Sequence, residues 1–470
     1  MEYLFPAVLL FVAFAAAIAI SLAGVGALNF TGKYKSGLLP YYCYALLMGN
    51  GVAVLLSTRN YLDTGELFSE STLSNPVAAL AIKVASLFVM IAAVDQFVRF
   101  FKSNKKFYFS RVFLFLSFAA FWVCNIILPA YFSPHRASME LSWTYSLVLG
   151  CGLILISGVD GYKFIEHFRN ATLSFCFVSL VLIFIKPSLV LQTNYAQGYI
   201  PGLPRFAGLA PHAILMGMIA SLALWCLFLQ PFQSRKLTIA FSMIGMIALF
   251  LSQAKNIWIS FFISMPILMY YRSDFSEWFK INHSKGRFLY FVVLILGFFL
   301  GLGGLYLVVF GNLDRFLAGI LRSEQGSQLL TFTGREQIWA VALSEWERSP
   351  LLGYGLPLFG PDHRNAVGMF FATSGHNQII DNLGRSGLIG AIASVVHFLA
   401  VTILGYLFRH KTQGLSWVLA LSLLVRMISE VPITLASISL DTLPYYLLLG
   451  MIAANMKLSD PKPSFLKMES

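Results

Sequence analysis

The sequence predicts an all-α, multi-pass membrane protein. Of its 470 residues, 58% are hydrophobic and only 11% are charged, and the mean hydropathy is +0.74. Apolar runs of about twenty residues, long enough to cross a bilayer as a helix, recur along the whole length. One long polar stretch, from Asn312 to Arg385, interrupts them. We therefore expect one transmembrane domain over residues 1–470, with about 12–13 helices and a large loop, 312–385, inserted between spans.

The expected spans follow the apolar runs in order. The opening run, at about 3–28, is longer than the core of a signal peptide and has no basic flank ahead of it, so we expect a retained helix. The remaining spans are expected at about 38–57, 76–97, 112–132, 140–158, 172–191, 208–229, 237–252, 257–271, 288–311, 386–408, 415–429 and 443–456.

Basic connections set the expected orientation. The positive-inside rule assigns short basic segments to the cytoplasm. An odd number of spans then puts the amino terminus outside and the carboxyl terminus inside, with Lys33 and Lys35 in the cytoplasm and the 312–385 loop on the outer, periplasmic side. The segments assigned to the cytoplasm are 99–111, 160–170, 231–236, 272–287, 409–414 and the tail from Lys457.

Arginine is concentrated on the expected outer face, whereas lysine is concentrated on the cytoplasmic face. A planar guanidinium makes bidentate hydrogen bonds to phosphate oxygens, so this face suits a phosphate or diphosphate ligand. Nucleic acid is excluded because the chain has no soluble basic domain. The five cysteines lie inside apolar runs without paired spacing, which indicates neither a disulfide nor a metal site. The outer arginines are Arg59, Arg136, Arg205, Arg315, Arg322, Arg335, Arg348, Arg364, Arg385 and Arg426.

Two of these arginines stand in segments suited to bind an anion. Thr333 and Glu336 have the spacing of a capping box, which predicts a helix from Gly334 to about Pro350 with Arg335 in its first turn. A helix N-terminus offers free N–H groups and a favourable dipole to an anion. Arg205 lies in a segment rich in glycine and proline before the seventh span. The alternatives are a surface charge for Arg335 and an interfacial, snorkelling side chain for Arg205.

His376 and Asn377 stand just before a new apolar run, and therefore at a membrane boundary. Because the ordinary pKa of an imidazole is about 6.5, a histidine keeps a substantial neutral fraction at near-neutral pH and can accept a proton from a sugar hydroxyl. This position makes His376 a candidate general base, with Asn377 placed to orient its ring or to bind sugar. The other histidines are interpreted as structural.

Several charged residues have structural explanations. Asp381 and Arg385 are four residues apart and are predicted to form an ion pair if that stretch is helical. Arg426 and Glu430 are also four apart, in the twelfth span, and are predicted to pair because charges at membrane depth need partners, with a ligand contact as the second interpretation. The acidic segment 59–75 is predicted to be a solvated loop rather than a metal site.

Taken together, these segments resemble the O-antigen ligase and polymerase superfamily over about residues 200–430. The resemblance starts from His376-Asn377, followed by Gly387 and Gly390, which is similar to the family's His-Asn/Ser/Gln motif. The chain departs from the family at Lys255, where arginine is frequent, and at His212, where asparagine is frequent. The other similar segments are Arg205-Phe-Ala-Gly208, Thr333-Gly-Arg335 with Trp339, and Pro350-Leu-Leu-Gly-Tyr-Gly355.

The resemblance implies a GT-C-like, inverting membrane glycosyltransferase that needs neither a metal nor a cofactor. Its donor would be an undecaprenyl-diphosphate-linked oligosaccharide. Arg205 and Arg335 would bind the diphosphate and His376 would act as general base. The implied setting is a bacterial inner membrane with the site facing the periplasm, with membrane lipids and a chain-length regulator or other polysaccharide-assembly proteins as partners. The supporting residues would be Asn377, Lys255, Asp381, Arg385 and Arg426.

Three alternatives remain open at this point. The motifs do not separate a polymerase, whose acceptor is another lipid-linked repeat unit, from a ligase, whose acceptor is lipid A-core. We favour a polymerase because the spans before Glu140 do not resemble those of the ligases. A transporter or flippase would show a charge relay or repeated broken helices, and the sequence has neither. A metal-dependent transferase would need clustered outer carboxylates, and only residues 63–70 offer any.

Overall fold

The computed structural model describes residues 37–57, 59–61, 76–102, 109–156, 161–192, 203–272, 335–369 and 372–456. The expected spans 3–28 and 288–311 lie outside the described residues. So do Lys33, Lys35, the capping residue Thr333 and the carboxyl-terminal tail. The orientation prediction depends on these segments and stays a prediction.

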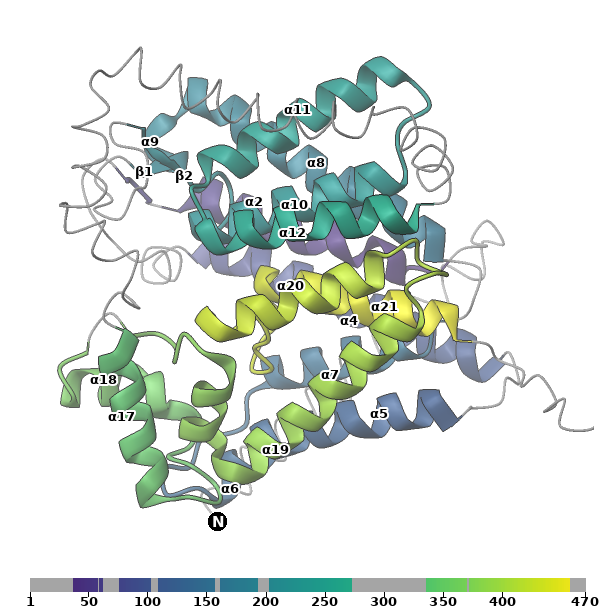
Figure 1. Ribbon diagram of the computed structural model, residues 1–470. Coiled ribbons are helices and arrows are strands. Elements are labelled where there is room, and N and C mark those ends of the chain that lie inside the picture. Colours follow the sequence, from purple (N-terminus) through teal and green to yellow (C-terminus); the bar gives the residue numbers. More distant parts are fainter. Residues whose placement is uncertain are drawn as a thin grey trace, which may run out of the picture.

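Long helices packed side by side form the bundle (Figure 1). Among the described residues, five segments are long and apolar enough to cross a membrane: Leu39–Leu56, Pro76–Lys102, Phe109–Phe132, Lys163–Ile185 and Gln378–Leu407. The expected all-α, multi-pass membrane fold is therefore confirmed. The bundle helices are α2 (Tyr42–Leu56), α4 (Pro76–Lys102), α5 (Phe109–Trp122), the π-helical η2 (Val123–Ile127), α6 (Leu128–Phe132), α7 (Leu141–Ile154), α8 (Gly161–Ile185), α10 (Ala213–Leu229), α11 (Arg235–Leu251), α12 (Lys255–Tyr271), α19 (Gln378–Leu407), α20 (Leu415–Ser429) and α21 (Leu443–Asn455).

Helices α10 and α21 are buried along almost their whole length and contribute heavily to the main apolar core. A helix that is apolar on every face is buried in this way. The amphipathic helix α11 keeps few buried residues and lies toward the outside of the bundle. The described chain also contains shorter elements: η1 (Leu39–Tyr41), α9 (Pro187–Val190), β1 (Leu191–Gln192), β2 (Arg205–Phe206), α17 (Arg335–Arg348), η3 (Leu356–Phe359), α18 (Pro361–Ala366) and η4 (Leu440–Thr442).

Two of the predicted boundaries are wrong. The segment 160–170, expected as a cytoplasmic connection, belongs to α8, which begins at Gly161. Helix α19 begins at Gln378 rather than near residue 386. In both cases polar turns continue a helix beyond its apolar part, and apolar run length cannot detect them. By contrast, α20 has the predicted bounds, and α17 confirms the helix predicted within the polar loop.

Helix α19 is broken at Gly387, which adopts φ +62° and ψ −163°. The segment 350–355 replaces the hydrogen bonds that the break removes. Leu388 and Ile389 donate their N–H groups to the Pro350 and Leu351 carbonyls at 2.8 and 3.3 Å. The N–H groups of residues 354 and 355 bond in turn to the carbonyls of residues 384 and 385, at 2.8 and 3.1 Å. The Pro350–Gly355 turn therefore fixes the direction of the first part of α19.

Buried polar side chains attach this first part of α19 to the bundle. Asn125, in the π-helical turn η2, donates from Nδ2 to the Gly390 carbonyl and to Ser394 Oγ, both at 3.1 Å. Asn382 donates to the same Ser394 hydroxyl at 2.6 Å, and Gln378 Nε2 donates to Asn382 Oδ1 at 3.3 Å. This chain of hydrogen bonds ends two residues after His376 and restrains the start of α19 from inside the bundle.

The short elements form two groups, one around β1 and β2 and one around α17 and α18. Both groups lie at the same end of the bundle, on the left in Figure 1. Strands β1 and β2 pair antiparallel, with Gln192 opposite Arg205. Helix α17 and the segment after it have a small apolar core of their own: Ile338, Ala342, Leu358, Phe359 and Ala372. Both arginine-bearing segments of interest therefore lie at the end of the bundle where α19 begins.

Candidate functional site

His376 is held in an uncommon backbone conformation at the start of α19. Its φ is +46°, in the left-handed region that residues other than glycine seldom adopt. The Gly375 N–H donates to Asp381 Oδ1 at 2.8 Å, and Trp339 Nε1 donates to the Gly375 carbonyl at 2.8 Å. Asn377 Oδ1 accepts the N–H groups of residues 379 and 380, at 3.0 and 3.1 Å, and so caps the helix. The surroundings thus determine where the imidazole lies.

Glu430 brings Arg335 and His376 together. Its Oε1 lies 3.1 Å from Arg335 Nη2, and its Oε2 lies 3.6 Å from His376 Nδ1. The three side chains come from the start of α17, the turn before α19 and the residue after α20, and their exposed fractions are 18% for Arg335, 29% for His376 and 15% for Glu430. Burial raises the pKa of Glu430, but His376 and Arg335 outweigh it and hold that pKa below its ordinary 4.5. Glu430 is therefore a carboxylate at neutral pH.

His212 connects this group to Arg205. It caps α10 by accepting the Leu215 N–H on Nδ1 at 3.3 Å. Burial lowers the pKa of His212, the carboxylates of Asp441 and Glu430 act to raise it, and Arg205 and Arg426 act to lower it. All four charges are therefore close enough to act on this imidazole. Arg205 itself is 7% exposed and donates from Nε to the Ser252 carbonyl at 2.9 Å.

Residues 218–395 match the family model described as O-antigen ligase. This match supports the resemblance of the chain to the O-antigen ligase and polymerase superfamily. No curated protein sequence matches the chain. The matched segment contains Arg335 and His376, whereas Arg205 precedes it and Glu430 follows it. The match therefore supports a membrane glycosyltransferase of the O-antigen ligase or polymerase type.

The predicted Arg426–Glu430 pair is wrong. Arg426 donates from Nη2 to Asp441 Oδ1 at 3.2 Å and from Nη1 to the Asp441 carbonyl at 3.3 Å. Glu430 has extended backbone dihedral angles because α20 ends at Ser429. The spacing rule for residues four apart holds only inside a helix, so it does not apply to this pair.

The Asp381–Arg385 pair is confirmed, with Arg385 Nε 3.1 Å from Asp381 Oδ2. Arg385 also donates to the Leu356 carbonyl at 3.0 Å, and Asp381 accepts the Gly375 N–H. Both residues therefore hold the turn before His376. Asn377 acts as a helix cap and donates from Nδ2 to the Ile428 carbonyl at 3.1 Å, which connects α19 to α20.

Lys255 begins α12 and is half-buried. The next residue, Asn256, donates from Nδ2 to Ser429 Oγ at 2.6 Å. Because Ser429 directly precedes Glu430, this bond holds the start of α12 against the end of α20. Lys255 therefore lies in the same region as Glu430, Arg335 and His376, which we call the Glu430 group.

Many of the outer arginines bind protein groups. Arg59 donates to the carbonyls of Leu189, Gly208 and Ala210 and so supports the segment that carries Arg205. Arg348 pairs with Glu345 at 2.9 Å. With Arg385 and Arg426 also paired, much of the arginine excess that suggested a phosphate ligand has a structural explanation. The expectation was too broad because composition counts charges without their partners.

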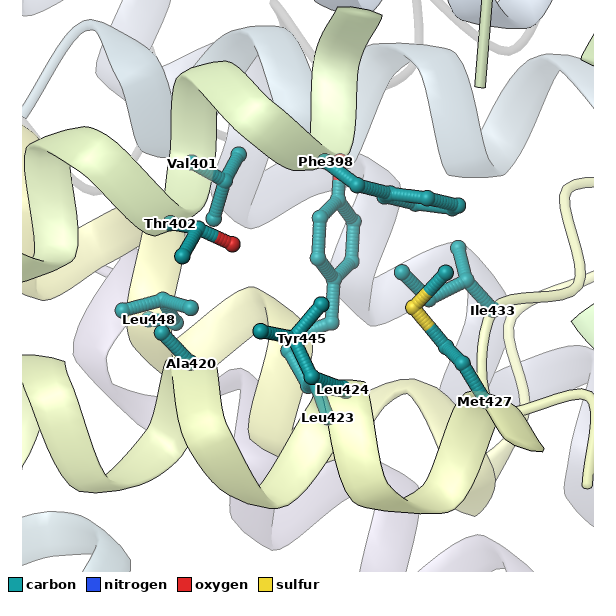
Figure 2. Close-up of a pocket in the computed structure, with 10 residues that line it drawn as sticks. All are labelled: Phe398, Val401, Thr402, Ala420, Leu423, Leu424, Met427, Ile433, Tyr445 and Leu448. Atoms are coloured by element: carbon teal, nitrogen blue, oxygen red, sulfur yellow. The ribbon is translucent and has the colours of Figure 1, made fainter. Parts of the chain in front are cut away.

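An apolar hollow borders the site. It lies between α19, α20 and α21, is partly open, and has a volume of about 10 Å³, which is room for about one water molecule. Figure 2 shows Met427 and Ile433 together at one end of it. These two residues flank Glu430 in the chain, and the Ile433 N–H donates to Gln378 Oε1 at 3.1 Å. The lining residues are Phe398, Val401, Thr402, Ala420, Leu423, Leu424, Met427, Ile433, Tyr445 and Leu448.

Acidic and metal-binding side chains do not cluster in the described part of the chain. No group of three or more His, Cys, Asp or Glu side chains there is arranged to hold a metal ion. The acidic residues Asp63, Glu66 and Glu70 lie outside the described residues.

Proposed function

We propose that this protein transfers an undecaprenyl-diphosphate-linked oligosaccharide to a sugar hydroxyl, with inversion at the anomeric carbon and without a metal ion. The observation that carries the proposal is the meeting of Arg335 and His376 on the two oxygens of Glu430. A cation suited to a diphosphate and a base suited to a hydroxyl thereby share one region at the end of the bundle. Arg205 is connected to this region through the electrostatic surroundings of His212.

The proposed reaction uses two kinds of side chain. His376 Nδ1 faces Glu430, which leaves Nε2 to take the proton of the acceptor hydroxyl. The hydroxyl oxygen then attacks the anomeric carbon from the face opposite the diphosphate, and the bond between that carbon and the diphosphate oxygen breaks. The diphosphate leaves with the electron pair. Arg335 and Arg205 stabilise the charge that develops on it, the task that a metal ion performs in other transferases.

We propose a polymerase as the more suitable assignment within the superfamily, with a lipid-linked repeat unit as acceptor. A ligase acting on lipid A-core is the second candidate, because the matching family model carries the description O-antigen ligase. For either activity we place the protein in a bacterial inner membrane, with the Glu430 group facing the periplasm. A chain-length regulator or another polysaccharide-assembly protein is the proposed partner.

A transporter is the alternative from another functional class. The broken helix α19 is relevant to it because transporters also contain broken helices. Transporters place broken helices where unwound backbone lines a substrate path. Here the Pro350–Gly355 turn fills the break at Gly387 and satisfies its backbone groups. This arrangement supports a fixed scaffold for His376 rather than a moving gate.

The proposal is tested with purified protein in nanodiscs, supplied with lipid-linked repeat units, with and without EDTA, and with products separated by size. We expect a ladder of longer lipid-linked products that EDTA does not reduce. His376→Ala should abolish the ladder. His410→Ala is the matched control, because His410 lies at the opposite end of α19 and packs on Tyr271. Products found only when lipid A-core is present would assign a ligase. Transfer to neither acceptor, or equal loss in both variants, would refute the proposed function.

A further inference from the structure

Arg335 already has an anionic partner. Glu430 Oε1 lies 3.1 Å from its Nη2, and both side chains are largely buried. The low pKa of Glu430, to which Arg335 itself contributes, keeps that partner ionised at neutral pH. A diphosphate that approaches Arg335 must therefore compete with the carboxylate. Two anions on one guanidinium repel each other, so the carboxylate and the diphosphate each weaken the binding of the other there.

The other oxygen of the same carboxylate faces an imidazole nitrogen that lacks a hydrogen bond. His376 Nδ1 is buried and makes no hydrogen bond among the described residues. Glu430 Oε2 lies 3.6 Å from it, close enough to interact electrostatically but too long for a good hydrogen bond. An unpaired buried polar atom costs free energy, so a small movement of the carboxylate toward Nδ1 would be favourable. While Glu430 stays on Arg335, however, this bond remains unformed.

We propose that Glu430 exchanges partners when the donor binds. This inference rests on the proposed function. The diphosphate takes Arg335, and the carboxylate moves onto the Nδ1–H of His376. That hydrogen bond fixes the tautomer and the direction of the ring, so that Nε2 is the nitrogen that accepts the acceptor proton. Glu430 stays ionised throughout. It is a positioning residue that makes activation of the base depend on the presence of the donor.

The exchange predicts opposite effects on binding and on rate. In Glu430→Gln the neutral amide competes poorly for Arg335, so the affinity for inorganic diphosphate should rise by about fivefold or more. The same amide cannot hold the imidazolium that forms in the transition state, so kcat should fall by about 10²-fold. Glu430→Asp keeps the charge and should recover part of the rate.

Glu345→Gln is the matched control. Glu345 also pairs with an arginine and a histidine, with Oε1 2.9 Å from Arg348 Nη1 and 3.4 Å from His363 Nε2. Glu345 and Arg348 lie at the end of α17 and His363 lies on α18, whereas Arg335 begins α17. Binding is measured by calorimetry with inorganic diphosphate, transfer is measured as kcat and KM, and thermal unfolding verifies that each variant is folded. We expect Glu345→Gln to resemble the wild type in binding and in rate.

Two outcomes would overturn the partner exchange. If Glu430→Gln binds diphosphate more weakly and loses rate in proportion, the role of Glu430 is only to hold the Arg335 side chain in place. If Glu430→Gln keeps the wild-type rate, the carboxylate does not act on His376. Both results presuppose a wild-type protein that transfers glycan. Absence of transfer by the wild type itself would instead refute the proposed function, so the two failures are distinguishable.

Discussion

Replacing Gly387 by alanine tests whether the break in α19 positions the site. With φ +62° and ψ −163°, Gly387 lies in a region that is accessible almost only to glycine, and a residue with a Cβ there costs about 1–3 kcal/mol. A Cβ would also collide with the carbonyl group of Leu351, which is backbone and cannot rotate away. Relieving that collision would stretch the hydrogen bonds of residues 388 and 389 to the inserted turn, each worth about 1 kcal/mol. We therefore expect Gly387→Ala to lower the free energy of unfolding by about 3–5 kcal/mol.

Gly368→Ala separates the two contributions. Gly368 also has positive φ, at +68°, but nothing lies within 4 Å of the position where its Cβ would be. It should therefore show only the backbone cost, about 1–2 kcal/mol. Both variants are unfolded in mixed micelles and followed by tryptophan fluorescence, and glycan transfer is measured on the folded fraction. Gly387→Ala should also lose transfer activity, because the start of α19 carries His376. Equal destabilisation by the two substitutions, with transfer intact, would refute the reasoning.

Three further predictions concern the charged residues. Arg205→Lys and Arg335→Lys should each lose most activity, because an ammonium cannot reproduce the bidentate guanidinium. Wild-type turnover in both variants would show that neither guanidinium binds the diphosphate. His376→Ala should lower turnover by roughly 10²–10⁴-fold while the lipid-linked donor still binds. Donor binding is measured by protection of the outer loop from proteolysis. Loss of binding with fast residual transfer would assign His376 to the diphosphate-binding site. Burial lowers the pKa of His212 below its ordinary 6.5, so the unfolded chain binds a proton that the folded chain does not, and stability should decline as the pH falls below about 6.5. His212→Asn keeps a helix cap and should flatten that dependence in thermal unfolding; an unchanged slope would assign it to another group.

The sequence predicted the bundle well where apolar run length decides the outcome. Helix α20 has the predicted bounds, and α17 begins and ends within two residues of the predicted Gly334 and Pro350. The sequence-based prediction failed where a polar turn extends a helix beyond its apolar run, as at the start of α8 and α19. It also identified the Pro350–Gly355 turn and Gly387 as motif segments without revealing that they bond to each other. That contact joins backbone groups more than thirty residues apart, and no local pattern carries it.

The partners of Glu430 could have been predicted from the expected membrane topology. Spacing within one helix assigned Glu430 to Arg426, yet its partner is Arg335, far away in the chain. The predicted topology contained a better guide. It started the span 415–429 from a cytoplasmic connection, so Glu430 had to emerge on the outer side, in the same layer as Arg335 and His376. A carboxylate in a layer dominated by arginine will pair with whichever guanidinium or imidazole lies within reach in space, and sequence distance imposes no preference. Sorting charged residues by membrane layer before sorting them by spacing would therefore have placed Glu430 with the two residues that it joins.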